Sequence, residues 1–381
     1  MLEIVDHLSR RIDGRVAGSE GERKASKYLA NKMKEIGLNV AVQRFKFVSW
    51  KPTLKPKLEV LEPERLKLNP GLMLFSDNTP KGGVEGRLVY SGIIYIVEGM
   101  FEWPKYAVVG KDGAVRGYII AFPDGPAISM PLTKMGRNFG RAPYLMIGKE
   151  DYLKIKNWID SGKHVRVKMR VEGKLENDLY SHNVIGTLPG TDLPDEEIIV
   201  CAHYDCAINS FGADDNASGV ETMLRVAKRL IKKGAKKTVK FIAFGAEEPL
   251  LSGSSYYAND LKERGLLNSV KALVNLDMTG AGERLTVASE PKSFHEFVCN
   301  TIMNSELRDK VKIDVNSMKI CEDSDHWEFH VNHIPVTTLL YWPYENYHQS
   351  SDTVDKLSEE LVDKTAEATY MLIKNLAFTV D

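Results

Sequence analysis

The chain has 381 residues, which exceeds the size at which one hydrophobic core usually keeps growing, so we expect two domains or an insert. Hydrophobic residues make up 43% and charged residues 27%, as in ordinary globular proteins. Lys and Arg number 51 against 52 Asp and Glu, a balance that gives no support for binding nucleic acid or an anionic membrane.

Neither the N-terminal residues nor the cysteines indicate export or membrane insertion. The first residues are too polar for a signal-peptide core, and no apolar run is long enough to span a bilayer. The cysteines form no Cys-x-x-Cys pair and are too sparse for a disulfide framework. We therefore expect a cytoplasmic protein with reduced thiols, and we interpret Cys201 and Cys206 as core residues.

The first predicted helix follows a capping-box pattern, in which Ser19 is followed three residues later by Glu22. Apolar residues then recur at helical spacing as far as Ile36, and Gly37 is a typical residue just past a helix end. Strand-like sequence continues over 38–48. We expect one amphipathic helix followed by a strand.

Prolines and glycines become frequent from about residue 53, and short β-type runs follow at 87–90, 93–97, 106–109 and 117–122. The segment shows little helix beyond 151–159. It contains no convincing catalytic constellation of its own. We predict a β-rich inserted domain at 53–176, between the two parts of a discontinuous domain at 1–52 and 177–381.

The remainder of the chain alternates between apolar runs and helical patterns. The runs at 198–202, 241–246, 271–276 and 334–341 are rich in Val, Ile and Phe, as buried strands are. One helix is predicted at 218–233 and a final one from about residue 358. This alternation indicates an α/β fold with a largely parallel sheet.

Five candidate metal ligands follow these runs or a glycine turn: His203, Asp215, Glu248, Asp277 and His348. In parallel sheets, ligands bind outside the carboxyl ends of the strands, so these groups can converge on one crevice. Two imidazoles and three carboxylates suit two divalent ions of zinc type. Glu247, beside Glu248, points another way and is a plausible general base.

Each of these motifs also has an ordinary structural interpretation. In His203-Tyr204-Asp205, the histidine is either a ligand that Asp205 orients through its second ring nitrogen or a capped loop residue. The acidic, glycine-bounded stretch 212–219 is either a ligand turn or a helix N-cap. The acids at 247 and 248 could simply begin a helix, where the macrodipole favours them.

The joint order of the motifs resembles the co-catalytic zinc aminopeptidases and their relatives, the glutamate carboxypeptidases and glutaminyl cyclases. The matching stretches are His203-Tyr204-Asp205, 212–219, Glu247-Glu248, Asn275-Leu276-Asp277-Met278, Ser324-Asp325-His326 and Tyr347-His348. Arg15 to Ser19 looks like the N-terminal Arg-x-x-Gly-Ser segment of the family. The insert looks like the protease-associated domain that some members carry.

The resemblance implies a three-layer αβα peptidase domain with a mixed, largely parallel sheet, and two Zn²⁺ ions per chain, with Co²⁺ or Mn²⁺ as substitutes. It also implies a role for each site residue. His203 and Asp277 would hold one ion, Glu248 and His348 the other, and Asp215 would bridge them. Glu247 would be the general base that activates the metal-bridging water, and Tyr347 would steady the carbonyl oxygen. Asp205, Asn216 and Asp325 would support the ligands, and the Asp215–Asn216 peptide bond would be cis.

The expected activity is that of an aminopeptidase acting on peptide substrates. A carboxypeptidase of the same superfamily is an alternative, and it would need a basic pocket for the substrate carboxylate. A glutaminyl cyclase is a weaker alternative because cyclases use one zinc. A receptor-like binding protein without catalysis is weaker still, since every ligand and the base are present. The sequence leaves the oligomeric state open, a homo-oligomer included.

Overall fold

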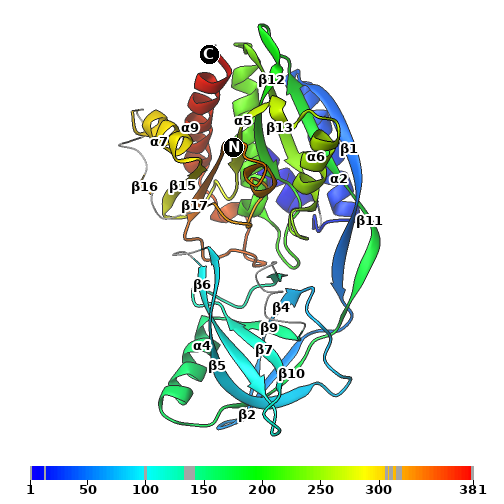
Figure 1. Cartoon of the computed structure of the whole chain (residues 1–381), viewed down its shortest axis with the longest axis vertical. Coiled ribbons are helices and arrows are strands. Elements are labelled where there is room, and N and C mark those ends of the chain that lie inside the picture. The colour runs from blue at the N-terminus through cyan, green and yellow to red at the C-terminus, as the bar shows by residue number, and fades with distance from the viewer. Residues whose placement is uncertain are drawn as a thin grey trace. The chain divides into compact units, whose positions relative to one another are not determined.

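The computed structural model describes residues 2–12, 14–97, 101–132, 142–304, 308, 312–314 and 320–378. The chain divides into two compact units, one made of Met1–Phe47 and Tyr180–Asp381 and the other of Val48–Leu179 (Figure 1). The chain passes from one unit to the other within strands β1 (Asn39–Pro52) and β11 (Gly173–Leu188). The interpretation of the second unit as a protease-associated domain stays a prediction.

The sheet of the first unit is mixed and largely parallel. Its strand order over the described residues is β1-β11-β13-β12-β14-β17-β15-β16. Strands β13, β12, β14 and β17 run parallel to one another, whereas β11 pairs with β13 and β15 pairs with β17 in antiparallel fashion. The strand bounds are β12 Leu193–His203, β13 Lys237–Phe244, β14 Val270–Leu276, β15 Arg284–Glu290, β16 Ile313–Asp314 and β17 Val336–Trp342.

Strand β12 shows why the predicted apolar runs are buried. Ile198 and Val200 pack into one hydrophobic cluster, and Ile199 and Cys201 pack into a second cluster on the opposite face. Successive side chains of a strand point to opposite faces, so a continuous apolar run is needed where both faces are covered. The same double burial holds for β13, β14 and β17.

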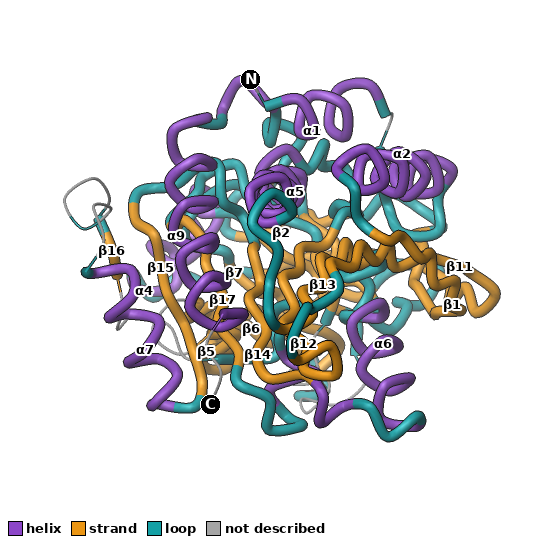
Figure 2. Tube along the Cα trace, turned by 90° about the horizontal axis from the view of Figure 1, so that it is seen from above, coloured by secondary structure: helices purple, strands orange, loops and turns teal. Residues whose placement is uncertain are grey.

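Helices cover both faces of this sheet, which confirms the three-layer αβα architecture. One cluster takes side chains from α1, α2, α5, α7 and α9, and the other from α6 and α8. Figure 2 shows α2 and α5 on one side of the strands and α6 on the other. The bounds are α1 Glu3–Asp6, α2 Glu20–Ile36, α5 Gly219–Leu230, α6 Ser252–Glu263, α7 Lys292–Met303, α8 Trp327–His330 and α9 Glu359–Phe378, with single turns at His7–Arg11, Ala213–Ser218, Leu267–Ser269 and Val354–Lys356.

The start of α2 follows the predicted capping pattern with one difference. The Ser19 side chain accepts a hydrogen bond from the backbone N–H of Glu22, and Gly37 ends the helix in the left-handed region. The Glu22 carboxylate, however, accepts from the backbone N–H of Gly18 rather than that of Ser19. Glu22 is thereby turned inward and fully buried, instead of lying on the surface of the helix.

The apolar side chains of α5 lie on one face, as predicted for the helix at 218–233. Val220, Met223, Ala227 and Leu230 are all fully buried in the cluster beneath the helix. Across the described helices, none is at once long enough and apolar enough to cross a bilayer. The cytoplasmic location stays a prediction.

The second unit is β-rich, as its sequence indicates. Its described strands form a sheet with the order β3-β2-β10-β5-β6-β7-β9-β4-β8, and its described helix is α4 (Lys149–Asp160). The predicted strands at 87–90 and 93–97 form one strand, β5, whose register with β6 shifts between Tyr90 and Ile93. The bounds are β2 Lys57–Glu62, β3 Leu66–Leu68, β4 Gly71–Leu74, β5 Val84–Val97, β6 Phe101–Val109, β7 Val115–Ala121, β8 Met130–Pro131, β9 Tyr144–Ile147 and β10 Arg166–Arg170.

Candidate metal centre

The carboxyl ends of the parallel strands carry the predicted ligands. His203 is the last residue of β12, Asp277 directly follows β14, and Glu248 lies four residues beyond β13. His348 follows β17 after a short loop, and Asp215 lies in the turn that leads into α5. Because these strands are neighbours in the sheet, their ends place the five side chains at one edge.

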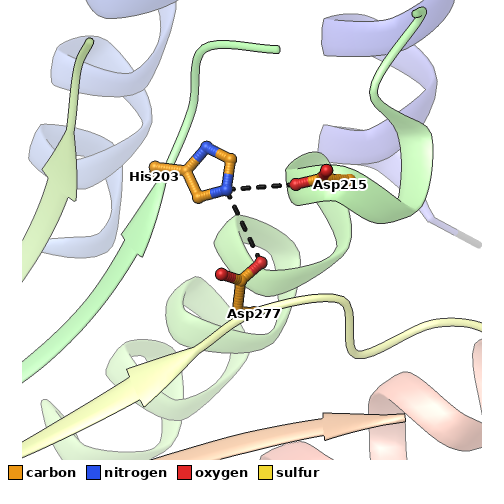
Figure 3. A group of neighbouring side chains, drawn as sticks. All are labelled: His203, Asp215 and Asp277. Carbon is orange, nitrogen blue, oxygen red and sulfur yellow. Dashed lines mark ion pairs between the residues drawn. The ribbon is translucent and has the colours of Figure 1, made fainter. Parts of the chain in front are cut away.

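The first ligand group consists of His203, Asp215 and Asp277 (Figure 3). The Nε2 atom of His203 lies 3.1 Å from Oδ1 of Asp215 and 3.5 Å from Oδ1 of Asp277. Figure 3 shows both carboxylates facing the same ring nitrogen from different elements of the fold. One imidazole nitrogen and two carboxylate oxygens thus surround a common point, as ligands of a divalent ion do.

The second ligand group consists of Asp215, Glu248 and His348. The Nε2 atom of His348 lies 3.0 Å from Oδ2 of Asp215 and 3.6 Å from Oε2 of Glu248. The two oxygens of Asp215 therefore face different imidazoles. This is the arrangement that a carboxylate needs in order to bridge two metal ions.

Burial shapes the electrostatics of these groups. It acts to raise the pKa of Asp215, but hydrogen bonds from His203 and His348 hold that pKa below its ordinary range. Burial acts to lower the pKa of His203, but the negative charges of Glu247 and Asp277 outweigh it and hold the pKa well above its ordinary value. Burial raises the pKa of Glu248 to about 8 against the opposing charge of His348.

Two buried ligand atoms lack a hydrogen-bond partner among the residues that the structure describes. They are Oε1 of Glu248 and Oδ1 of Asp277. Buried polar atoms without a partner cost free energy, so each needs an explanation. Carboxylate oxygens and imidazole nitrogens are zinc ligands, and the residues present therefore fit a metal centre.

The turn that presents Asp215 is tied to the loop that presents Asp277. The Asn216 side chain donates to the backbone oxygen of Leu276 at 2.8 Å and accepts from the N–H groups of Gly219 and Met278. The peptide bond between Asp215 and Asn216 is cis, as the resemblance implies. Asn216 therefore lies where a supporting residue was predicted.

A second support of Asp215 was missed in the sequence. The fully buried carboxylate of Asp352 accepts hydrogen bonds from the backbone N–H groups of Asp214 and Asp215, at 2.8 and 3.2 Å, and from the Tyr344 hydroxyl at 2.9 Å. The available signal was its position four residues after the predicted ligand His348, which is a weak signal by itself.

Asp205 lies beside His203, but its main contacts differ from the expected one. Its Oδ1 is 3.6 Å from Nδ1 of His203, which is longer than a hydrogen bond. The two carboxylate oxygens instead accept from the backbone N–H groups of Glu247 and Glu248, at 3.0 and 3.1 Å. Asp205 therefore fixes the loop that carries the glutamate pair.

The described hydrogen bond to the Asp277 side chain comes from Ser324, whereas Asp325 was the residue of this stretch predicted to support the ligands. The Ser324 hydroxyl donates to Oδ2 of Asp277 at 2.6 Å and accepts from the Asn275 side chain at 2.8 Å. Asp325 is fully buried nearby, and burial raises its pKa to about 7 against the opposing charge of His203.

Glu247 and Tyr347 lie at the same site without belonging to either ligand group. Oε2 of Glu247 is 3.9 Å from Nε2 of His203, and burial raises the pKa of this carboxyl well above its ordinary value. The Tyr347 ring stacks on His348 at 3.9 Å between centroids. Burial has the largest effect on the phenol and, together with the negative charges of Asp215 and Glu248, raises its pKa well above the ordinary value. The Tyr347 hydroxyl therefore stays protonated.

The chain is similar to known aminopeptidases over almost its whole length. Aminopeptidase YwaD of Bacillus subtilis (strain 168) is 27% identical over 403 residues, covering 97% of this chain and 84% of that protein. Two solved structures share the fold. An aminopeptidase from Aneurinibacillus sp. strain AM-1 gives a TM-score of 0.71 at 23% identity, covering 100% of this chain and 94% of that one. BSAP, a zinc aminopeptidase from Bacillus subtilis, gives a TM-score of 0.68 at 21% identity, and the match covers 99% of this chain and 94% of that one.

The family profile that matches this sequence is described as Peptidase family M28, and it covers residues 183–373, about half of the chain. This segment contains both ligand groups, together with Glu247 and Tyr347. The chain belongs to Peptidase family M28.

Proposed function

We propose that this protein is a dinuclear zinc aminopeptidase that hydrolyses N-terminal residues of peptides. The observation that carries the proposal is the pair of ligand groups that share Asp215, with one carboxylate oxygen toward each imidazole. The printed names of the relatives support the reaction and the metal, because YwaD is an aminopeptidase and BSAP is a zinc aminopeptidase.

Each ion would have its own imidazole and carboxylate in addition to the shared Asp215. His203 and Asp277 would hold one ion, and Glu248 and His348 the other. The same ligands would accept Co²⁺ or Mn²⁺. When bound, the ions would lower the pKa of water toward neutrality and polarise the peptide carbonyl.

Glu247 is the residue best placed to move the proton. It lies outside both ligand groups, so its carboxylate is not needed to hold an ion. Its burial disfavours the charged form, so this carboxylate accepts a proton more readily than that of an exposed glutamate. Glu247 would take a proton from the attacking water and then deliver it to the leaving amine.

Tyr347 would act on the carbonyl oxygen of the substrate. A phenol that stays protonated can donate a hydrogen bond to an oxygen on which negative charge develops. The stacking of Tyr347 on His348 and its edge contact with Trp342, at 5.7 Å between ring centroids, limit the positions that the ring can take.

The charge of the site favours an amine end over a carboxylate end. In the described part of the chain, the site carboxylates form ion pairs with His203 and His348 and with no lysine or arginine. A substrate ammonium group would be attracted to these acids, whereas a substrate carboxylate would need a cation. This supports the aminopeptidase over the carboxypeptidase alternative.

Three versions of one short peptide test the direction of cleavage. The free peptide and a C-terminally amidated copy should be hydrolysed, and an N-acetylated copy should not, since it lacks the ammonium group. Mass spectrometry of the products identifies the residue released. Hydrolysis of the acetylated peptide with release of its last residue would support the carboxypeptidase instead.

Metal counting and a matched pair of variants test the mechanism. The wild type should hold about two zinc ions by elemental analysis. Glu247→Gln should keep both and lose about 10²–10⁴-fold in kcat, the usual contribution of a general base. Glu248→Gln makes the same change at the neighbouring residue, which is a predicted ligand, and this variant should hold less zinc than the wild type. A count near one would favour the cyclase, and retained turnover in Glu247→Gln would remove the proposed base.

A further inference from the structure

Arg15 is a fully buried arginine in the segment between the first helical turns and α2. The hydrogen bonds of its guanidinium go to backbone oxygens. Nε donates to Tyr204 at 2.7 Å, Nη2 to Gly212 at 2.8 Å, and Nη1 to both Leu8 and Phe211 at 2.9 and 2.8 Å. No carboxylate pairs with this guanidinium among the described residues, which is unusual for a buried charge.

Three of the four acceptors belong to one loop, residues 204–212, which joins His203 to the turn that carries Asp215. Tyr204 is the first residue of this loop and Gly212 is the last. The backbone N–H of Arg15 also donates to Sγ of Cys206 inside the same loop, at 3.3 Å. One planar guanidinium therefore holds both ends of the loop in a fixed relation.

Gly212 shows how closely the guanidinium fits. Its φ is +62°, a conformation that favours glycine, and a Cβ at this position would lie 2.6 Å from Nη2 of Arg15. The contact leaves no room for a side chain at the last residue of the loop. Any shift of Arg15 is thus transmitted to the backbone just ahead of Asp215.

We propose that Arg15 is a positioning residue that sets the spacing between His203 and Asp215 and thereby the affinity of the metal centre. The inference rests on the proposed function, since it takes these two residues as ligands. His203 belongs to one ligand group only, whereas Asp215 belongs to both. Loss of the guanidinium should therefore weaken the binding of both ions. The effect should be larger for the ion held by His203 and Asp277 than for the other.

The test compares Arg15→Lys with Arg225→Lys by titrating the metal-free proteins with Zn²⁺ against a chromophoric chelator. Arg225 is a suitable control because it is a partly buried arginine of α5 that pairs with Glu221 and Asp363. Arg15→Lys keeps the charge but not the planar fork. We expect it to bind zinc about 10- to 100-fold more weakly, the usual effect of losing a supporting group. Arg225→Lys should match the wild type.

Thermal unfolding separates this role from a purely structural one. If Arg15→Lys melts at a lower temperature but binds zinc as tightly as the wild type, the inference is wrong and the proposed function stands. If the variant is unfolded without metal, a series of melts at increasing Zn²⁺ gives its affinity through the stabilisation of the folded chain. A variant that stays unfolded at saturating zinc also overturns the inference, and a wild type that binds no zinc overturns the proposed function.

Discussion

Glu22 carries a carboxyl group that is buried in the folded protein. The free energy of unfolding should therefore depend on whether this carboxyl group is protonated. Its Oε2 accepts from the N–H of Gly18 at 2.6 Å, and its Oε1 accepts from the Ser181 hydroxyl. Burial, together with the negative charge of Asp205, raises its pKa from 4.5 to about 8. The folded chain thus keeps a proton that the unfolded chain releases. Stability should be fully present below pH 4.5 and be lost as the pH rises toward 8.

The magnitude follows from the shift. Each pKa unit corresponds to about 1.4 kcal/mol, and pH 7 lies roughly 2.5 units above the unfolded value, so release of this proton by the unfolded chain alone should lower the stability of the fold by about 3 kcal/mol at neutral pH. Glu22→Gln cannot ionise. Its amide oxygen can accept from Gly18 and its amide nitrogen can donate to Ser181. The variant should therefore be about 3 kcal/mol more stable than the wild type at pH 7, and the difference should close near pH 4.5.

Urea unfolding followed by helical circular dichroism, at several values between about pH 5 and 8, measures this difference. A chelator should be present so that metal binding adds no pH dependence of its own. Glu20→Gln is the matched control, since Glu20 lies in the same helical turn but is exposed and pairs with Lys24. Its effect should stay within about 0.5 kcal/mol at every pH. A constant difference between Glu22→Gln and the wild type would refute the reasoning, because it would mean that Glu22 ionises normally.

Two further variants probe the supports of the metal ligands. Asp352→Asn places an amide N–H where the carboxylate now accepts hydrogen bonds from the backbone of Asp214 and Asp215. The variant should therefore unfold in urea with a free energy about 2–3 kcal/mol lower than that of the wild type, and it should bind zinc more weakly. A zinc affinity equal to that of the wild type would contradict this prediction. Ser324→Ala removes the hydroxyl that donates a hydrogen bond to Asp277. In a chelator titration, the affinity for one of the two zinc ions should fall about tenfold. An equal loss at both ions would show that Ser324 does not act through Asp277.

The parts of the site that were predictable from sequence share a physical reason. A strand covered by helices on both faces must be apolar throughout, so β12, β13, β14 and β17 stand out as runs. A polar residue that interrupts such a run marks its end. His203 and Asp277 are both of this kind, and the rule for parallel sheets then places them at one edge.

Two of the supporting residues, Arg15 and Asp352, could not be predicted in this way, because their partners are backbone atoms far away in the chain. Arg15 binds carbonyl groups of residues 204, 211 and 212, and Asp352 binds N–H groups of residues 214 and 215. Every residue has such groups, so they leave no pattern in the sequence. Ser324 lies in a stretch that was predicted to belong to the site, but nothing local marked it as the residue that contacts Asp277.

The excess of buried acids gives the clearest reason why this edge of the sheet needs cations. Five carboxyl groups meet two imidazoles there: Asp205, Asp215, Glu247, Glu248 and Asp277 against His203 and His348. Without metal, the fold limits the repulsion by keeping protons, as the raised pKa values of Glu247, Glu248 and His203 indicate. A ligand must lose its proton to bind an ion. Metal binding at this site therefore competes with protons, and its apparent affinity must rise with pH as Glu248, with a pKa of about 8, and His203 lose their protons.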